Sequence, residues 1–162
     1  MDIVRDKMLI LDADALNLLS KNPDWYLTIP GNCVLTPHPG EMARLTGMSI
    51  ADIQADRANI ALSKAMEWHQ IVLLKGANTV IAAPEGYSVV LPYQTSALSM
   101  AGSGDVLSGI IAGFAAQGKF PFDAAWLGGE IHARAGLLLA DGFGQSYSVM
   151  AGDLLTTIPA AI

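Results

Sequence analysis

The sequence predicts an α/β fold with a mostly parallel sheet, because short apolar runs alternate with a helical segment along the chain. Three continuous apolar runs are typical of strands buried on both faces, and they lie at Met8–Leu11, Cys33–Thr36 and Ile71–Gly76. Between the last two runs, residues 51–68 carry apolar side chains at helical spacing, with charged side chains largely on the opposite side. A strand, a helix and a strand at this spacing form a βαβ unit, whose strands are parallel.

A hairpin is predicted at one edge of the sheet. Two β-rich runs, Thr79–Ala83 and Tyr87–Leu91, flank the short turn Pro84-Glu85-Gly86. Three helices are expected to follow, at roughly 104–117, 121–140 and 151–160. We therefore expect an antiparallel edge on an otherwise parallel sheet.

Length and composition favour one globular domain that spans residues 1–162. Hydrophobic residues make up 52% of the 162 residues and charged residues 15%, so a sizeable core is expected and disorder is not. The net charge is −6 and the nine Lys and Arg are scattered, which argues against nucleic-acid binding. An anionic ligand must then be held by local dipoles and a few cations.

Cysteine usage and the apolar segments bear on the compartment. Cys33 is the only cysteine, which excludes an intrachain disulfide and a cysteine-rich zinc site. The first residues contain no apolar core of a signal peptide. The most apolar stretch, 106–116, is too short to cross a bilayer, which needs about 20 residues. We expect a cytoplasmic enzyme that does not enter a membrane.

Polar or glycine-containing loops follow the predicted strands, at 12–17, 36–41 and 75–79. In parallel α/β sheets ligands bind outside the carboxyl ends of the strands, so these loops predict one shared site. The glycine-rich turn at 102–109 opens an apolar helix, whose first amides and dipole suit a phosphate. Asp105 lies in the first turn of that helix, where a carboxylate either caps the helix or accepts a proton; the local pattern leaves both open.

Five motifs carry a family resemblance. They are Asp-Ala-Asp-Ala-Leu-Asn at 12–17, Leu-Thr-Pro-His-Pro-Gly-Glu at 35–41, Leu-Lys-Gly-Ala at 74–77, Ala-Gly-Ser-Gly-Asp-Val-Leu-Ser-Gly at 101–109 and Ile-His-Ala-Arg-Ala-Gly at 131–136. Over nearly the whole chain the set resembles the ADP/ATP-dependent NAD(P)H-hydrate dehydratases, a carbohydrate-kinase-like family of the ribokinase-like superfamily. The motif at 35–41 separates this family from the sugar and vitamin kinases. The resemblance implies a three-layer ribokinase-like fold.

The resemblance also implies a reaction, the repair of hydrated NADH or NADPH with ADP or ATP and Mg²⁺ as cofactors. The nucleotide phosphorylates the hydroxyl on the hydrated nicotinamide ring, and loss of phosphate restores the dinucleotide. Asp105 would be the general base that activates this hydroxyl. The other implied contacts are nucleotide binding by Lys75, Gly76, Ala77, Asn78, Thr79, Gly102, Ser103 and Gly104, substrate binding by His38 with Asp105, and Mg²⁺ arranged through water by Glu41 and Asp12.

Simpler interpretations stay open for several of these residues. His38 is also compatible with a loop residue bonded to backbone, Lys75 with a solvated charge, and Asp12 with a turn former. His132 is expected to pack near the nucleotide rather than act in catalysis, and His69 to lie at the surface. Two other functions are a phosphotransferase of the same superfamily acting on a small alcohol, and a non-catalytic nucleotide-binding module.

The chain departs from the family pattern in two places. Residues 93–100 lack the Gly-Asn-Pro-like segment that usually precedes the glycine-rich turn. The N-terminal βα units of full members, with their own glycine-rich loop, are absent, so we expect the C-terminal portion of a longer protein. The apolar surface left exposed predicts a homo-oligomer or association with the missing N-terminal part.

Overall fold

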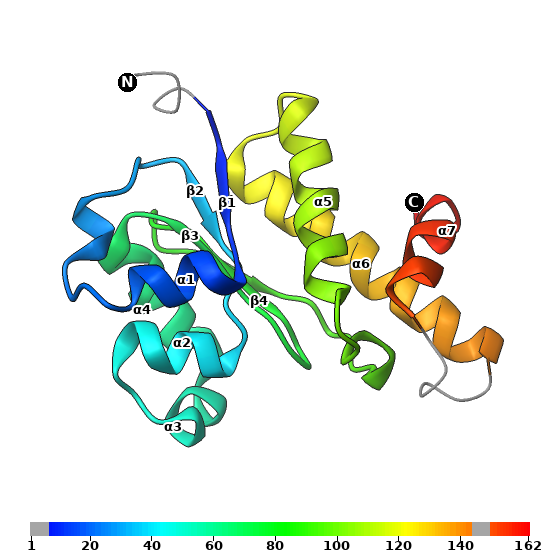
Figure 1. The fold of residues 1–162 in the computed structure, drawn as a ribbon, viewed down its shortest axis with the longest axis horizontal. Helices are drawn as coiled ribbons and strands as arrows, with labels where there is room; N and C mark the ends of the chain where they lie inside the picture. Colours follow the sequence, from blue (N-terminus) through cyan, green and yellow to red (C-terminus); the bar gives the residue numbers. More distant parts are fainter. Residues whose placement is uncertain (1–6, 144–149) are drawn as a thin grey trace.

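The computed structural model describes residues 7–143 and 150–162, which form three layers with a mixed sheet in the middle (Figure 1). Along the chain the elements are β1 (Leu9–Leu11), α1 (Ala13–Leu19), the 3-10 helix η1 (Trp25–Leu27), β2 (Cys33–Leu35), α2 (Pro39–Thr46), α3 (Ile50–Ala55), α4 (Arg57–Trp68), β3 (Ile71–Leu74), β4 (Val80–Ala82), β5 (Ser88–Val90), the 3-10 helix η2 (Ser96–Leu98), α5 (Ser103–Ala116), α6 (Pro121–Phe143) and α7 (Ala151–Ala161).

The sheet has the strand order β1-β2-β3-β4-β5. β1 pairs with β2 and β2 with β3 in parallel, as the βαβ pattern predicts. β4 pairs antiparallel with both β3 and β5, so β4 is the one strand of this sheet that runs against the other four. The mostly parallel sheet with an antiparallel edge hairpin is therefore confirmed.

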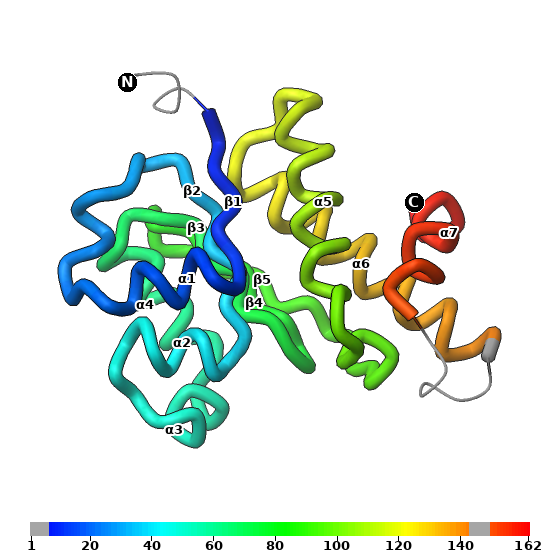
Figure 2. Tube along the Cα trace, in the orientation of Figure 1, coloured from blue at the N-terminus to red at the C-terminus, as the bar shows by residue number. Residues whose placement is uncertain are grey.

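The two faces of the sheet are covered by different helices (Figure 2). Side chains alternate along each strand, so that Leu35 packs toward α1–α4 and its neighbour Val34 packs toward α5 and α6. A third apolar cluster joins α5, α6, α7 and η2 away from the sheet. These three clusters confirm the three-layer arrangement and fix α5 and α6 against one face of the sheet.

The helix predicted over 51–68 is two helices, α3 and α4, and this prediction is corrected. Asp56 interrupts them with φ −144° and ψ 55°, which is not helical. The break turns Arg57 toward the sheet, where its guanidinium Nη2 donates to the carbonyls of Leu74 at 2.8 Å and Lys75 at 3.1 Å. Helical periodicity continues across the break, so it did not reveal the change of direction.

Two segments predicted as polar loops are helix beginnings. α1 starts at Ala13 with Asp12 as its N-cap, and α2 starts at Pro39 with His38 as its N-cap. Proline at the first helical position suits the start of α2, because it lacks the N–H that would have no acceptor there. The polar residues still lie at the carboxyl ends of β1 and β2, where the sequence placed them.

The three helices predicted after the hairpin are confirmed as α5, α6 and α7, with α6 extending three residues beyond its predicted end. Among residues 7–143 and 150–162, no helix is long and apolar enough to cross a membrane. β1 forms one edge of the sheet, and its three residues are only half-buried, whereas β2, β3 and β4 are buried throughout.

Candidate functional site

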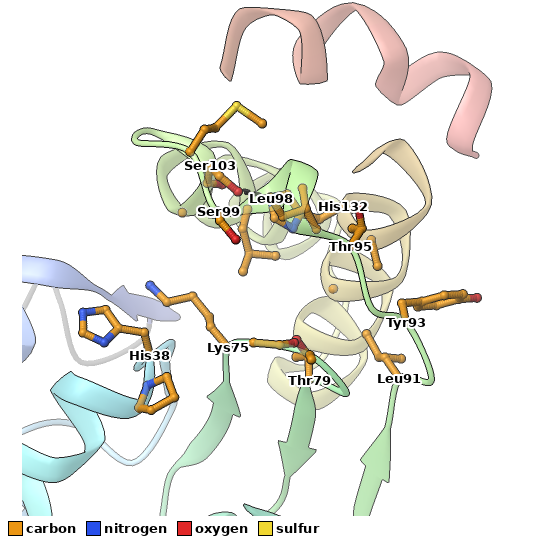
Figure 3. A pocket seen from close by; sticks show the side chains of 18 residues that line it. His38, Lys75, Thr79, Leu91, Tyr93, Thr95, Leu98, Ser99, Ser103 and His132 are labelled. Atoms are coloured by element: carbon orange, nitrogen blue, oxygen red, sulfur yellow. Dashed lines mark hydrogen bonds between the residues drawn. The ribbon is translucent and has the colours of Figure 1, made fainter. Parts of the chain in front are cut away.

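A cavity of about 360 Å³ opens at the carboxyl ends of β2 and β3 (Figure 3). We call it the carboxyl-edge cavity. The loops at the sheet edge form one side, and η2, α5 and α6 form the other. Its lining consists of His38, Pro39, Lys75, Gly76, Ala77, Thr79, Leu91, Tyr93, Thr95, Leu98, Ser99, Met100, Ser103, Gly104, Leu107, Gly129, His132 and Ala133. Among these residues Lys75 is the only Lys or Arg and there is no Asp or Glu, so the lining favours an anion.

The beginning of α5 forms the upper wall. Gly102 is the N-cap residue with φ +86°, a conformation that favours glycine. The N–H of Ser103 donates to the carbonyl of Met100 at 3.4 Å, while the N–H groups of Gly104 and Asp105 have no acceptor within the helix because they belong to its first turn. The sequence grouped the amides of residues 102–104; the geometry instead favours those of Gly104 and Asp105 for a phosphate.

Lys75 lies directly after β3 and faces both the cavity and an acidic pair behind it. Its Nζ lies 2.6 Å from Oδ1 of Asp12 and 3.8 Å from Oε2 of Glu41. The backbone of Lys75 is also fixed, because its N–H donates to the carbonyl of Pro37 at 2.8 Å. The interpretation of Lys75 as a solvated surface charge is therefore wrong, since a partly buried ion pair holds its ammonium at the cavity.

Gly104 leaves room for this ion pair. A Cβ at position 104 would lie 3.2 Å from Oδ2 of Asp12 and 3.4 Å from Nζ of Lys75. Ser108, one turn further along α5, reaches the same Asp12 oxygen at 3.5 Å. A side chain at position 104 would therefore require the Asp12 carboxylate and the Lys75 ammonium to shift by a few tenths of an ångström.

His38 and Glu41 form a capping box at the start of α2. Nδ1 of His38 accepts the N–H groups of Gly40 at 2.9 Å and Glu41 at 3.2 Å, and Oε2 of Glu41 accepts the N–H of His38 at 2.8 Å. Because Nδ1 accepts, the ring proton of the neutral imidazole lies on Nε2, 3.3 Å from Oε1 of Glu41. His38 is therefore bonded to backbone, as its simpler interpretation proposed, and it also lines the cavity.

Asp12 and Glu41 supply the carboxylates that the sequence assigned to Mg²⁺. Both approach the Lys75 ammonium, which is their cationic partner in this structure. Among the described residues no group of three or more His, Cys, Asp or Glu side chains is arranged to hold a metal. Two carboxylates fit Mg²⁺ that also binds nucleotide phosphates and keeps several waters.

Arg57 supports the 75–79 loop from behind, a role that sequence reasoning missed because Arg57 fell on the polar face of the predicted helix. It binds the carbonyls at the end of β3, and Gly76, at φ +135°, passes beside its guanidinium. A Cβ on Gly76 would lie 3.3 Å from both Nη atoms. Burial lowers the pKa of Arg57, because desolvation disfavours its charged form.

The apolar wall of the cavity is the other part that the sequence did not identify. It is formed by side chains of η2, α5, α6 and the residues that follow β5 and η2, namely Leu91, Leu98, Met100, Leu107 and Ala133. Tyr93 closes one end, and its hydroxyl donates to Glu130 at 2.6 Å, which raises the pKa of Tyr93. The only sequence signal was the apolar face of α6, which is equally typical of a helix packed in a core.

The close approach of α6 to the cavity depends on small residues. A Cβ on Gly129 would lie 3.0 Å from Leu91, and one on Gly136 would lie 2.6 Å from Leu98. His132, between them, is buried and lines the cavity, and its place near a nucleotide stays a prediction. His69 is exposed at the opposite end of the sheet.

The structure brings most of the predicted site residues together. Seven of them line the cavity, namely His38, Lys75, Gly76, Ala77, Thr79, Ser103 and Gly104. Asp12 and Glu41 lie behind Lys75, Gly102 caps α5, and Asn78 shapes the loop at φ +54°. Asp105 is exposed in the first turn of α5 outside the cavity lining, and within the described residues its side chain makes no capping bond. Its carboxylate is thus free to meet a substrate that approaches from outside.

Comparison with known proteins gives a consistent result. A family model described as NAD(P)H-hydrate dehydratase matches residues 3–160. The chain is 51% identical over 150 residues to the bifunctional NAD(P)H-hydrate repair enzyme Nnr of Moorella thermoacetica, covering 93% of this chain and 28% of that protein. It is 39% identical over 151 residues to the ADP-dependent (S)-NAD(P)H-hydrate dehydratase of Neisseria meningitidis, covering 92% of this chain and 51% of that protein.

A solved structure matches the fold over nearly the whole chain. The ADP/ATP-dependent NAD(P)H-hydrate dehydratase of Bacillus subtilis, co-crystallised with ATP/Mg²⁺, has a TM-score of 0.85 and 32% identity, covering 99% of this chain and 56% of that one. A ribokinase-like superfamily protein of Enterococcus faecalis has a TM-score of 0.74 and 26% identity. The ribokinase-like fold is thereby confirmed, and the chain spans only about a quarter to about half of the length of these relatives.

Proposed function

The chain belongs to the NAD(P)H-hydrate dehydratase family, and we propose that it binds ADP or ATP with Mg²⁺ and dehydrates hydrated NADH or NADPH. The name of the Neisseria relative supports ADP as the phosphoryl donor, and the Bacillus structure, obtained with ATP/Mg²⁺, supports ATP as well. Because those proteins are longer than this chain, the activity, the substrate and the partners are proposals for this chain.

One observation carries the proposal: the carboxyl-edge cavity combines an apolar wall with an anion-binding end. Lys75 and the first-turn amides of α5 lie at one side, where phosphates would be held. Leu91, Leu98 and Leu107 offer a surface on which an adenine ring would be buried. An adenine nucleotide has this same division between an apolar base and a charged tail.

The proposed reaction has two steps. The hydroxyl oxygen on the hydrated nicotinamide ring forms a bond to the terminal phosphorus of the nucleotide, and the bond from that phosphorus to the bridging oxygen breaks. ADP is thereby converted to AMP, or ATP to ADP, and the hydroxyl proton passes to a base. The carbon–oxygen bond of the ring phosphate then breaks with loss of a neighbouring ring proton, which restores the double bond and releases phosphate.

Asp105 is the proposed base, because its exposed carboxylate stands in the first turn of α5 beside the amides that would hold the transferred phosphate. His38 presents a ring edge to the cavity from the opposite wall, which suits a contact to the hydrated ring. Mg²⁺ arranged by Asp12 and Glu41 would neutralise charge on the phosphates. The amides of Gly104 and Asp105 would stabilise negative charge on the transferred group.

We further propose that residues 1–162 act as a single domain in the cytoplasm, associated with a second copy or with further βα units. The half-buried edge strand β1 supports association, because its outer side has no pairing strand among the described residues. Its neighbour β2, which is paired on both sides, is buried throughout.

The test measures recovery of NADH absorbance from hydrated NADH with Mg²⁺ and either ADP or ATP. Asp105→Asn is expected to lower the rate by about 10²- to 10⁴-fold, the usual contribution of a general base. ADP binding, measured by calorimetry, should survive this change because Asp105 does not line the cavity. Asp14→Asn is the matched control, since Asp14 is also an exposed carboxylate in the first turn of a helix.

Three outcomes separate the functions. Recovery of NADH that Asp105→Asn abolishes supports the dehydratase. Phosphorylation of a hydroxymethyl-pyrimidine or thiazole alcohol without NADH recovery supports the small-alcohol phosphotransferase instead. Nucleotide binding with neither activity supports a non-catalytic module, and absence of any ADP or ATP binding contradicts the proposal as a whole.

A further inference from the structure

His132 is a buried imidazole that the proposed reaction does not use. It lies on α6 with 8% of its surface exposed, and it faces the first residue of α5. Its Nε2 lies 3.0 Å from Oγ of Ser103 and 3.0 Å from the backbone carbonyl oxygen of Ser103 (Figure 3). No other side chain of α6 is hydrogen-bonded to α5 within the described residues.

The carbonyl contact decides which ring nitrogen carries the proton. A carbonyl oxygen only accepts hydrogen bonds, so an Nε2 at 3.0 Å is favourable only if it is a donor. An unprotonated Nε2 would place its lone pair against that oxygen. The pKa of His132 is lowered from 6.5 to about 4, mainly by burial and also by the nearby Lys75, while the bond to the Ser103 carbonyl opposes this shift. The ring is therefore neutral at pH 7, with Nε2 protonated and Nδ1 unprotonated.

This arrangement fixes the role of the Ser103 hydroxyl. Its oxygen faces a donor on His132, so its own proton does not point to the imidazole. Within the described residues the hydroxyl has no other hydrogen-bond partner, although Ser103 is only 4% exposed and lines the carboxyl-edge cavity. A buried hydroxyl without an acceptor is costly, and the open side of Ser103 is the cavity.

We infer that His132 is a positioning residue that turns the Ser103 hydroxyl outward as a hydrogen-bond donor to the terminal phosphate of the bound nucleotide. The inference rests on the proposed nucleotide binding. The Ser103 hydroxyl becomes a third donor beside the Gly104 and Asp105 amides. This role explains why a histidine, rather than an apolar residue, fills this position on α6. The same hydrogen bond holds the first turn of α5 against α6, so the donor is fixed before the nucleotide arrives.

The first test compares the affinities of ADP and AMP for the native chain and its variants by calorimetry. Ser103→Ala and His132→Leu should each weaken ADP binding about tenfold and leave AMP binding within about twofold, because only ADP carries the terminal phosphate that the hydroxyl reaches. His132→Gln keeps an N–H at a similar position and should stay within about threefold of the native ADP affinity. A merely structural role of His132 would change both affinities together.

The double variant His132→Leu with Ser103→Ala should lose no more ADP affinity than either single change, because both act through the same hydroxyl. His69→Asn is the matched control: it removes an exposed histidine at the other end of the sheet and should change neither affinity. Thermal unfolding of each variant checks the fold. If His132→Leu does not fold, Ser103→Ala and His132→Gln still carry the comparison.

A second measurement reads the tautomer directly. Nitrogen-15 chemical shifts of the His132 ring, assigned by their absence in His132→Gln, should show a protonated Nε2 and an unprotonated Nδ1 at pH 7. The opposite tautomer would overturn the inference, as would an unchanged ratio of ADP to AMP affinity in Ser103→Ala. If the native chain binds neither nucleotide, the proposed function and this inference fail together; if it binds ADP with unchanged ratios in the variants, only the inference fails.

Discussion

Two cavities of almost equal volume lie at opposite ends of the sheet, about 360 Å³ at the carboxyl edge and about 350 Å³ at the amino edge. The amino-edge cavity is lined by the starts of β2 and β3, the β4–β5 turn and the beginning of α6, from Gly31–Cys33, His69–Ile71, Pro84–Glu85, Tyr87 and Phe120–Asp123. Each cavity contains the first turn of a long helix, α5 in one case and α6 in the other. Volume and a helix dipole therefore do not distinguish them.

Charge and backbone chemistry distinguish them. The carboxyl-edge cavity carries Lys75 and no carboxylate in its lining, whereas the amino-edge cavity carries Glu85 and Asp123 and neither Lys nor Arg. Both helices carry a carboxylate in the first turn, Asp105 in α5 and Asp123 in α6, but only Asp123 lines its cavity. α6 also begins with Pro121, which has no N–H. The two helix beginnings therefore differ mainly in local charge, because a lysine lines the cavity at α5 and two carboxylates line the cavity at α6.

The largest of these effects concerns the free energy of unfolding at acid pH, through His132 in the carboxyl-edge cavity. The pKa of His132 falls from 6.5 to about 4 on folding, so between these values the unfolded chain binds more protons than the folded one. The free energy of unfolding should therefore fall as the pH drops from about 6.5 to about 4, by roughly 3 kcal/mol from this residue alone. Urea unfolding at several pH values in this range measures it.

His132→Gln is the control for acid stability, because glutamine does not titrate. Its loss of stability over the same pH range should be smaller than that of the native chain by about the same roughly 3 kcal/mol. An equal loss in both proteins would show that other groups cause the acid sensitivity.

The second effect concerns the one cation in the lining. Lys75→Gln should weaken ADP binding about 30-fold, because it removes a charged donor to the phosphates and leaves Asp12 and Glu41 facing them. Calorimetry measures the change. Lys64→Gln removes a lysine that is paired with Glu67 on the surface of α4, and it should have no effect. Similar affinities for native protein and Lys75→Gln would remove the main difference between the two cavities.

The third effect concerns the close approach of Gly104 in α5 to the Asp12–Lys75 pair. Gly104→Ala should weaken ADP binding about tenfold, because the added Cβ meets the Asp12–Lys75 pair and covers the adjacent amides. Gly109→Ala, on the same helix, adds a Cβ with nothing within 4 Å and should only stabilise the helix, by roughly 0.5–1 kcal/mol. ADP titration and thermal unfolding of both variants separate binding from stability, and equal ADP affinities would contradict the proposed phosphate position.

The smallest effect is expected at the amino edge. Asp123→Asn removes a carboxylate from that cavity, and it should change ADP affinity by less than about twofold because the two cavities lie at opposite ends of the sheet. A calorimetric titration that continues to excess ADP also gives the number of ADP molecules bound per chain. A second bound ADP in this variant would show that charge alone kept the amino-edge cavity from binding the nucleotide.

Local patterns in the sequence predicted much of this architecture. The runs at 8–11, 33–36 and 71–76 contain β1, β2 and β3, because a strand covered on both faces requires apolar side chains along its length. The turn at 84–86 likewise predicted the antiparallel edge. The split of 51–68 at Asp56 was missed, since both halves bury the same side and periodicity reports only that side.

The site residues divide in the same way, into those with a local signal in the sequence and those without one. The loop at 75–79 and the turn with Ser103 and Gly104 have local meaning, as the end of a strand and the start of a helix, whereas nucleotide binding by Lys75 was implied by the family resemblance. Arg57 and the apolar wall from Leu91 to Ala133 were not found, because an arginine on a polar helix face and leucines on an apolar one are ordinary features. The assignment of Asp105 as the base stays a prediction until its variant is measured.

The sequence by itself determined the α/β class, the strand ends on which polar residues gather and the glycine-rich start of α5, because strand burial, helix starts and turns depend on neighbouring residues. Only the tertiary structure decided which of those ends meet. The Lys75–Asp12 pair joins residues 63 positions apart, and the His132–Ser103 contact joins residues 29 positions apart. Such contacts depend on how helices pack across the sheet, where small residues such as Gly104 and Gly129 set the distance of approach.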